Sequence, residues 1–223
     1  MMTLGKSQVM KRLVTQALFD AGYVHLGEGV YKAALGSLDV EHFIYILDDL
    51  KREYVISGEI GIRNDSAEVF SCNAIRRYGG LLFQQFKCGE PCSCMMRVYF
   101  EGLDNSGWPV HLHDIAEEPL RDFLQDFFAR RVASTIGVVK DLEKFLEFLV
   151  ADKPYFPWPG SNAAIRAAQV VAVAREIGLS ADFIHAMLEP RMRLIAAGLS
   201  KTSEMRANPK AYVDRILEDW ELQ

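Results

Sequence analysis

Hydrophobic and polar positions alternate most regularly between residues 40 and 63. A period of two is typical of a β-strand with different environments on its two faces. A polar stretch at 48–52 interrupts the alternation, so the pattern predicts two adjacent strands joined by a turn. Their apolar positions are Val40, Ile44 and Ile46 with Phe43, Tyr45 and Leu47 opposite, then Ile56, Ile60 and Ile62. Such strands need a sheet with one face packed against helices.

Helical patterns flank this pair of strands. Ser7 can cap a helix whose apolar residues recur at intervals of three and four, and Gly22 follows where that helix should end. A second amphipathic helix is predicted over 66–77. Short strands are predicted at 30–32, 81–86 and 92–101, where β-formers alternate with glycine and proline turns. The first 103 residues therefore predict a mainly antiparallel sheet of about five strands with two helices.

The pattern changes from residue 104 onward. Helical periodicity is predicted at 114–132, 138–150, 162–177 and 180–190, and again after Asn208-Pro209. Pro154, Pro157 and Pro159 deny a helix to the segment 153–160, which is the clearest break in the chain. We therefore predict an α+β fold with two domains: a sheet domain at 1–103 and an all-helical region at 104–223.

Four segments of the first half resemble a known family. The helix end Ala21-Gly22-Tyr23, the strand Gly29-Val30-Tyr31-Lys32, the strand Phe43 to Leu47 and the run Ile60-Gly61-Ile62 are similar to a family of uncharacterised bacterial proteins, catalogued as domain of unknown function 4304. The resemblance implies a bacterial α+β domain without an assigned activity. It implies no catalytic residue.

Composition narrows the class of protein. Half of the residues are hydrophobic and 25% are charged, as in globular proteins, and the formal net charge of -5 argues against a nucleic-acid partner. No apolar run is long enough for a membrane helix, and the amino-terminal residues do not form a signal peptide. Four cysteines in a chain of this length favour a reducing compartment. We therefore expect a cytoplasmic protein. The sequence does not indicate its oligomeric state.

A cluster of cysteines and histidines is the sharpest candidate for chemistry. Cys88, Cys92 and Cys94 lie close in sequence to His111 and His113. Thiolate and imidazole are the ligands that zinc takes in tetrahedral sites. The spacing differs from the two cysteine pairs of a zinc ribbon, and Cys92 and Cys94 alternate with apolar residues as core strand residues do. The cysteines could therefore be zinc ligands or buried residues of a strand, and both hypotheses are kept.

Two other stretches could bind a partner. Seven acidic residues and one arginine occur between residues 98 and 129, a field that could attract a basic protein. The acidic candidates are Asp114, Glu117, Glu118, Asp122 and Asp126. The aromatic residues Tyr155, Phe156 and Trp158 follow in the proline-rich break. The alternatives are a solvated helical face and rings that fix a connection to the core.

The sequence lacks the common catalytic motifs. It has no phosphate-binding or dinucleotide-binding glycine motif, no Gly-x-Ser-x-Gly and no His-Glu-x-x-His. The function that we predict is a non-enzymatic protein-binding module of the adaptor or immunity type, without a cofactor. The alternative is a zinc-binding protein or small metalloenzyme built on the cysteine and histidine cluster.

Overall fold

The computed structural model describes residues 6–27, 29–35, 38–48, 54–85, 96–99, 110–112, 117–132, 141–151 and 162–222. The chain forms two compact units, each assembled from separate stretches of sequence. One, which we call the sheet unit, combines residues 1–35, 39–62 and 97–140. The other, the helical unit, combines 36–38, 63–96 and 141–223. Our predicted domains are continuous in sequence, and that division stays a prediction.

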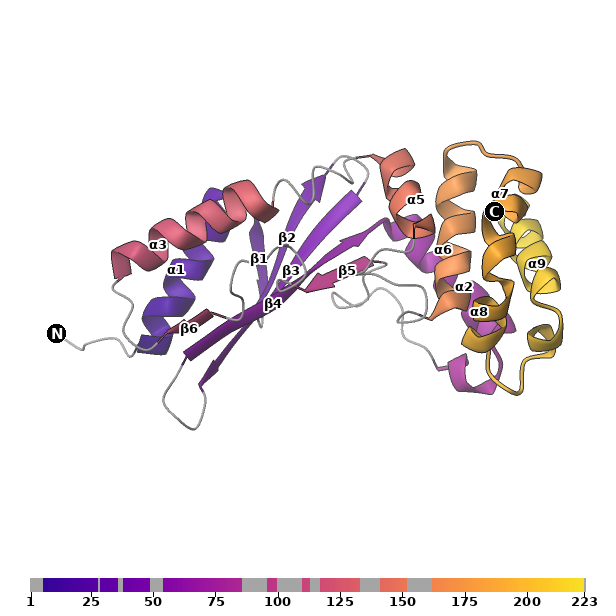
Figure 1. Ribbon diagram of the computed structural model, residues 1–223, viewed down its shortest axis with the longest axis horizontal. Coiled ribbons are helices and arrows are strands. Elements are labelled where there is room, and N and C mark those ends of the chain that lie inside the picture. Colours follow the sequence, from indigo (N-terminus) through magenta and orange to yellow (C-terminus); the bar gives the residue numbers. More distant parts are fainter. Residues whose placement is uncertain are drawn as a thin grey trace. The chain divides into compact units, whose positions relative to one another are not determined.

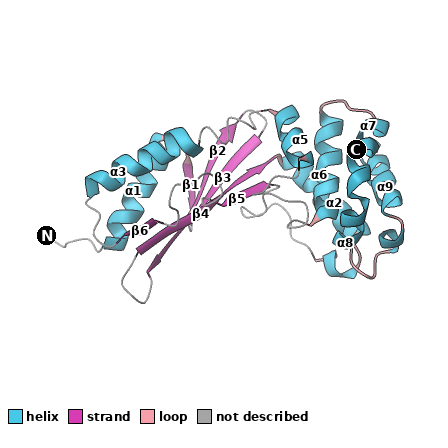
Figure 2. Cartoon of the chain, in the orientation of Figure 1, coloured by secondary structure: helices cyan, strands magenta, loops and turns pink. Residues whose placement is uncertain are grey.

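Six strands are present among the described residues. They are β1 (Val24–Gly27), β2 (Val30–Leu35), β3 (Leu38–Asp48), β4 (Tyr54–Arg63), β5 (Met96–Tyr99) and β6 (Val110–Leu112). Their order is β1-β2-β3-β4-β5, and β6 also pairs with β4. The β1–β2 pair is antiparallel with His25 opposite Tyr31, and β6 runs antiparallel to β4 with His111 opposite Val55. Figure 2 shows the strands in magenta.

Two helical segments of the sheet unit lie side by side (Figure 1). These are α1 (Lys6–Asp20) and α3 (Glu117–Asp126), which continues as a π-helical turn η3 (Phe127–Val132). Each turns an apolar stripe inward, which is what the helical spacing requires. The buried stripes are Met10, Leu13, Val14, Ala17 and Leu18 on α1, and Leu120, Leu124, Phe127 and Phe128 on α3 and η3.

The helical unit contains the remaining helices. They are α2 (Asp65–Tyr78), η1 (Leu81–Phe83), α5 (Leu142–Val150), α6 (Ala163–Glu176), α7 (Ala181–Leu188), η5 (Glu189–Arg191), α8 (Met192–Gly198), η6 (Glu204–Ala207) and α9 (Pro209–Glu221). The η elements of this unit are short 3-10 turns. Figure 1 shows α6 in orange among its neighbours.

Helix α6 is the centre of the helical unit. It contacts α2, α5, α7, α8 and α9, and almost all of its side chains are buried. Alanine and valine dominate its sequence, and such small side chains allow neighbouring helices to approach closely from every side. The OH of Tyr212 on α9 donates to the Ala164 carbonyl at 2.9 Å. Burial raises the pKa of this phenol, which keeps the donor proton in place.

A charged side chain lies inside this apolar core. Arg166 of α6 is only 1% exposed. Its guanidinium donates to the carbonyls of Leu149 and Ala151 at 2.8 and 2.9 Å, at the carboxyl end of α5. Arg191 donates to the Val150 carbonyl in between, at 2.6 Å. Two arginines thus satisfy three consecutive carbonyls that a helix end leaves without a partner within the helix.

Side chains cap the starts of several helices, as is usual for asparagine and serine. Asn64 accepts a hydrogen bond from the Ala67 amide, Ser180 from that of Phe183, and Asn208 from that of Ala211. The predicted cap Ser7 is wrong, because α1 begins one residue earlier, at Lys6. The helix predicted from residue 138 begins at Leu142, after the cap Asp141.

The predicted fold class is wrong. Most described residues are helical, and the sheet unit takes helices from both sides of residue 103, α1 before it and α3 after it. The sheet is not the five-stranded one that we predicted. Residues 81–83 form the turn η1 where a strand was expected, and β6 lies in the region predicted to be all helical. A short apolar run such as Leu81-Leu82-Phe83 carries no period, so it does not distinguish a strand from a helical turn.

Among the described residues, no helix combines the length and the apolar character needed to cross a bilayer.

The buried arginine generates a stability prediction. Replacing Arg166 by methionine keeps most of the side-chain volume but removes both hydrogen bonds to the end of α5. We expect the free energy of unfolding in urea to fall by about 3 kcal/mol, since hydrogen bonds to charged groups contribute ~1.5–3 kcal/mol each and the carbonyls stay buried. The control is Arg193→Met on the exposed side of α8, which should change it by less than about 0.5 kcal/mol. Equal effects of the two variants would contradict this role.

Candidate functional site: a docking groove in the helical unit

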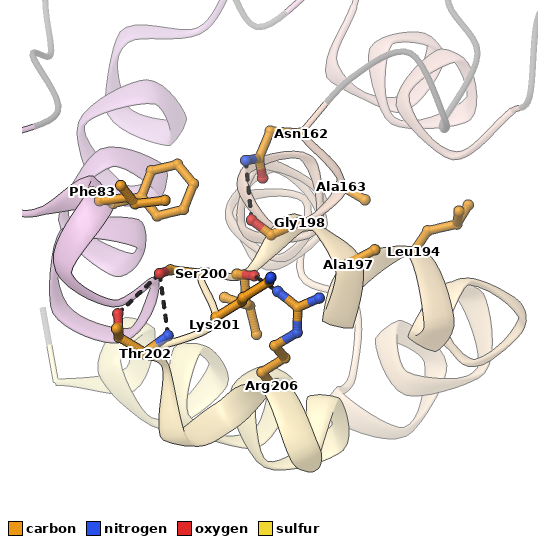
Figure 3. Close-up of a pocket in the computed structure, with 12 residues that line it drawn as sticks. Phe83, Asn162, Ala163, Leu194, Ala197, Gly198, Ser200, Lys201, Thr202 and Arg206 are labelled. Carbon is orange, nitrogen blue, oxygen red and sulfur yellow. Dashed lines mark hydrogen bonds between the residues drawn. The ribbon is translucent and has the colours of Figure 1, made fainter.

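An open groove of about 740 Å³ lies within the helical unit. We call it the docking groove. The turn η1, the amino end of α6, helix α8 and the chain between α8 and η6 form its walls. The residues that line it are Leu82, Phe83, Asn162, Ala163, Leu194, Ala197, Gly198, Leu199, Ser200, Lys201, Thr202 and Arg206. Figure 3 shows these side chains as sticks.

The segment Ser200 to Ser203 fixes one wall of the groove. The Ser200 amide donates to the Gly79 carbonyl at 2.9 Å, and the Ser203 hydroxyl donates to the Tyr78 carbonyl at 2.5 Å. In return, the Leu81 amide donates to Thr202 Oγ1 at 2.9 Å. Three hydrogen bonds therefore hold this segment against the end of α2 and η1, more than a hundred residues away in sequence.

Gly80 makes this close contact possible. Its φ is +90°, in the region that favours glycine. A Cβ at this position would lie 2.7 Å from Thr202 Oγ1 and 2.9 Å from the Ser203 amide nitrogen. Both the backbone conformation and the available space therefore require glycine here.

A second glycine brings α8 to the amino end of α6. A Cβ on Gly198 would lie 2.7 Å from the Ala164 amide nitrogen. Asn162 joins the two segments, because its side-chain nitrogen donates to the Gly198 carbonyl at 3.1 Å while its oxygen accepts from the Ala164 and Ile165 amides. Figure 3 shows the first of these bonds. The amino end of α6 is thus part of the groove wall.

The chemistry of the groove is apolar with a cationic part. Leucine, phenylalanine and alanine side chains supply much of its lining, and Lys201 and Arg206 supply two positive charges. Arg206 donates to the Leu199 carbonyl at 2.8 Å, which fixes its guanidinium at the wall. Lys201 is exposed at the tip of the Ser200–Ser203 segment.

Two hydroxyl side chains also line the groove, beside the cations. Ser200 and Thr202 share a hydrogen bond of 2.9 Å between their hydroxyl oxygens. The described residues that line the groove include no aspartate, glutamate, histidine or cysteine. The arrangement can bind apolar groups and anions.

The acidic residues predicted to bind a partner lie on α3 of the sheet unit. Glu117 pairs with Arg12 of α1 at 2.6 Å and with Arg121 at 3.1 Å, so two arginines offset its charge. Glu118 and Asp122 are exposed one turn apart, and Asp126 is half-buried. Of the predicted acidic residues on α3, Glu118 and Asp122 are therefore the ones best placed to contact a partner.

The other predicted site residues are not described. Asp114, Tyr155, Phe156 and Trp158 lie outside the described residues, as do Cys88, Cys92, Cys94 and His113. His111 belongs to β6, but its side chain is not described. Within the described ranges, no group of three or more His, Cys, Asp or Glu side chains could hold a metal ion. The side chains of the zinc hypothesis are not described, so it stays a prediction.

Sequence reasoning missed the docking groove. Its lining residues come from two separate parts of the sequence, 82–83 and 162–206, and only the fold brings them together. A partial signal was present, because Gly79-Gly80 is followed by three apolar residues, which we interpreted as a strand.

Searches against protein-family models, curated proteins and solved structures found no match for this chain. The resemblance to the family of unknown function stays a prediction.

The glycine contact generates a second prediction. Gly80→Ala should lower the free energy of unfolding by about 3 kcal/mol, since it adds an unfavourable φ of ~1–2 kcal/mol to the cost of overpacking. Gly178→Ala is the matched control, because Gly178 has a φ of +82° but no atom within 4 Å of the added Cβ. We expect a loss of about 1–2 kcal/mol there. Urea denaturation measures both, and equal losses would show that the contact with Thr202 is unimportant.

Proposed function

We propose that this protein is a non-enzymatic protein-binding module that accepts apolar side chains of a partner in the docking groove. The observation that carries the proposal is the exposure of Leu81 and Leu82 beside the groove, at 63% and 80%. Adjacent exposed leucines at a hollow with apolar walls form the kind of surface that marks protein interaction sites. Adaptors and toxin-neutralising immunity proteins are two kinds of protein whose role is to bind a partner protein.

The support beneath the leucines favours binding. The Leu81 amide donates to Thr202, and Gly80, directly before Leu81, lies in close contact with the Ser200–Ser203 segment. A surface that is already fixed loses little conformational entropy when a partner docks. The hydrogen bonds around η1 therefore favour affinity as well as stability.

The position of the leucines favours a protein over a small molecule. Leu82 lines the groove but is mostly exposed, and Leu81 is exposed next to it without lining the groove. A small molecule inside the hollow would leave much of this apolar surface in water. A peptide segment or a protein surface can cover the exposed leucines and fill the groove at the same time. That burial supplies most of the favourable free energy of binding.

A charge placed on the rim tests this function. Short random peptides displayed on phage are selected on the purified protein, and the enriched peptides are synthesised. Leu82→Glu should weaken their binding at least about tenfold, because burial of a leucine contributes ~1.5–3 kcal/mol. Fluorescence anisotropy measures the change.

The matched control is Leu222→Glu, since Leu222 is 85% exposed and does not line the groove. It should leave the affinity unchanged. Both residues are so exposed that neither variant should alter the urea unfolding curve. A failure to enrich any peptide, or enriched peptides that bind Leu82→Glu normally, would contradict the proposed function.

A second surface is a candidate for a basic partner. Glu118 and Asp122 are exposed on α3 at positions that share one face of the helix. Their charges are available to a cationic segment, and such contacts steer association more than they add affinity. We propose this acidic face as a separate site, independent of the docking groove.

A double charge reversal tests the acidic face. The probe is a peptide of lysine and glycine alone, which has no apolar side chain to enter the groove. Glu118→Lys with Asp122→Lys should weaken its binding about fivefold at low salt, as measured by anisotropy. The control is Glu143→Lys with Glu147→Lys, an exposed acidic pair at the same spacing on α5 that changes the net charge equally. Equal weakening would mean that net charge alone matters, and would contradict a defined acidic face.

A further inference from the structure

The chain around the docking groove is basic in an otherwise acidic protein. Residues 191–206 contain four cationic residues, Arg191, Arg193, Lys201 and Arg206, against the single acid Glu204. The formal net charge of the whole chain is -5. This local reversal lies on the segment that forms one wall of the groove, so the sign of the charge there differs from that of the protein as a whole.

Two of these cations line the groove itself. Lys201 stands on the segment that Gly79, Tyr78 and η1 hold in place, and Arg206 is held by the Leu199 carbonyl. A carbonyl partner fixes the guanidinium but does not neutralise its charge. Figure 3 shows both side chains on the same side of the groove.

The amino end of α6 adds a field of the same sign. Asn162 and Ala163 begin this helix and line the groove. Asn162 already caps the Ala164 and Ile165 amides, so the helix end contributes through its dipole and not as a separate binding site. The helix dipole and the two side-chain cations therefore act together on whatever occupies the hollow.

We propose that the docking groove recognises a partner segment in which acidic side chains flank apolar ones. This inference rests on the proposed function and specifies the partner. Apolar side chains would cover Leu82 and enter the hollow, while carboxylates would meet Lys201 and Arg206. Burial supplies affinity in this arrangement, and the cations select among apolar segments by their charge.

Two pools of labelled synthetic peptides test the inference. Both share the same leucine and phenylalanine positions, and the remaining positions are glutamate and serine in the acidic pool but lysine and serine in the basic pool. Groove binding is defined as the part of the anisotropy signal that Leu82→Glu removes. We expect the acidic pool to bind the groove about fivefold more tightly at low salt, and high salt to remove most of that preference.

The variant Lys201→Glu should reverse the preference between the pools. The control Lys210→Glu changes an exposed lysine on α9 that does not line the groove, and it should leave the preference intact. Equal groove binding of the two pools would overturn the inference while the proposed function stands. If neither pool shows binding that depends on Leu82, the proposed function fails as well.

The oligomeric state tests whether a second copy of this chain, and not another protein, fills the groove. Light scattering is measured on the intact chain over a range of concentrations, with Leu82→Glu as the comparison. A monomer supports a segment of another protein as the occupant. A dimer that Leu82→Glu dissociates would overturn this assignment, because a second copy of the chain would then fill the groove.

Discussion

The helical unit depends on a charge buried in its core. Arg166 lies on α6, where almost all side chains are buried, and its guanidinium reaches the carbonyl end of α5. Burial of a charge costs free energy unless hydrogen bonds satisfy it, and here the acceptors are groups that would themselves be buried without partners. The hydrogen bonds therefore offset the free-energy cost of burying both the guanidinium and the carbonyls. They also give α5 a defined position against α6.

The same helix links this contact to the docking groove. At its first turn, α6 receives Gly198 of α8 and the Tyr212 hydroxyl of α9, and Asn162 closes the contact. Arg166 lies one turn further along. The position of the groove wall is therefore set by the packing that buries Arg166, which connects stability and the candidate site through a few contacts on one helix.

The candidate site combines a fixed backbone with exposed apolar side chains. Thr202 accepts a hydrogen bond from the first amide of η1, and Ser200 and Ser203 donate to carbonyls at the end of α2 just before it. Leu82 is presented on that support. Proteins rarely leave adjacent leucines in water without a use for them. Lys201 and Arg206 add positive charge to this surface. The apolar side chains would therefore supply affinity, and the two cations would select among partners by their charge.

The sequence by itself determined the local elements. The caps Asn64, Ser180 and Asn208 act within three residues, and the apolar stripe of α1 depends only on helical spacing, so both could be predicted. Tertiary structure decided the rest. Nothing in a pattern of apolar residues shows that Arg166 reaches α5, that Gly80 meets Thr202, or that Leu81 to Phe83 form a turn. These contacts join residues far apart in the chain, and their partners exist only once the helices have packed.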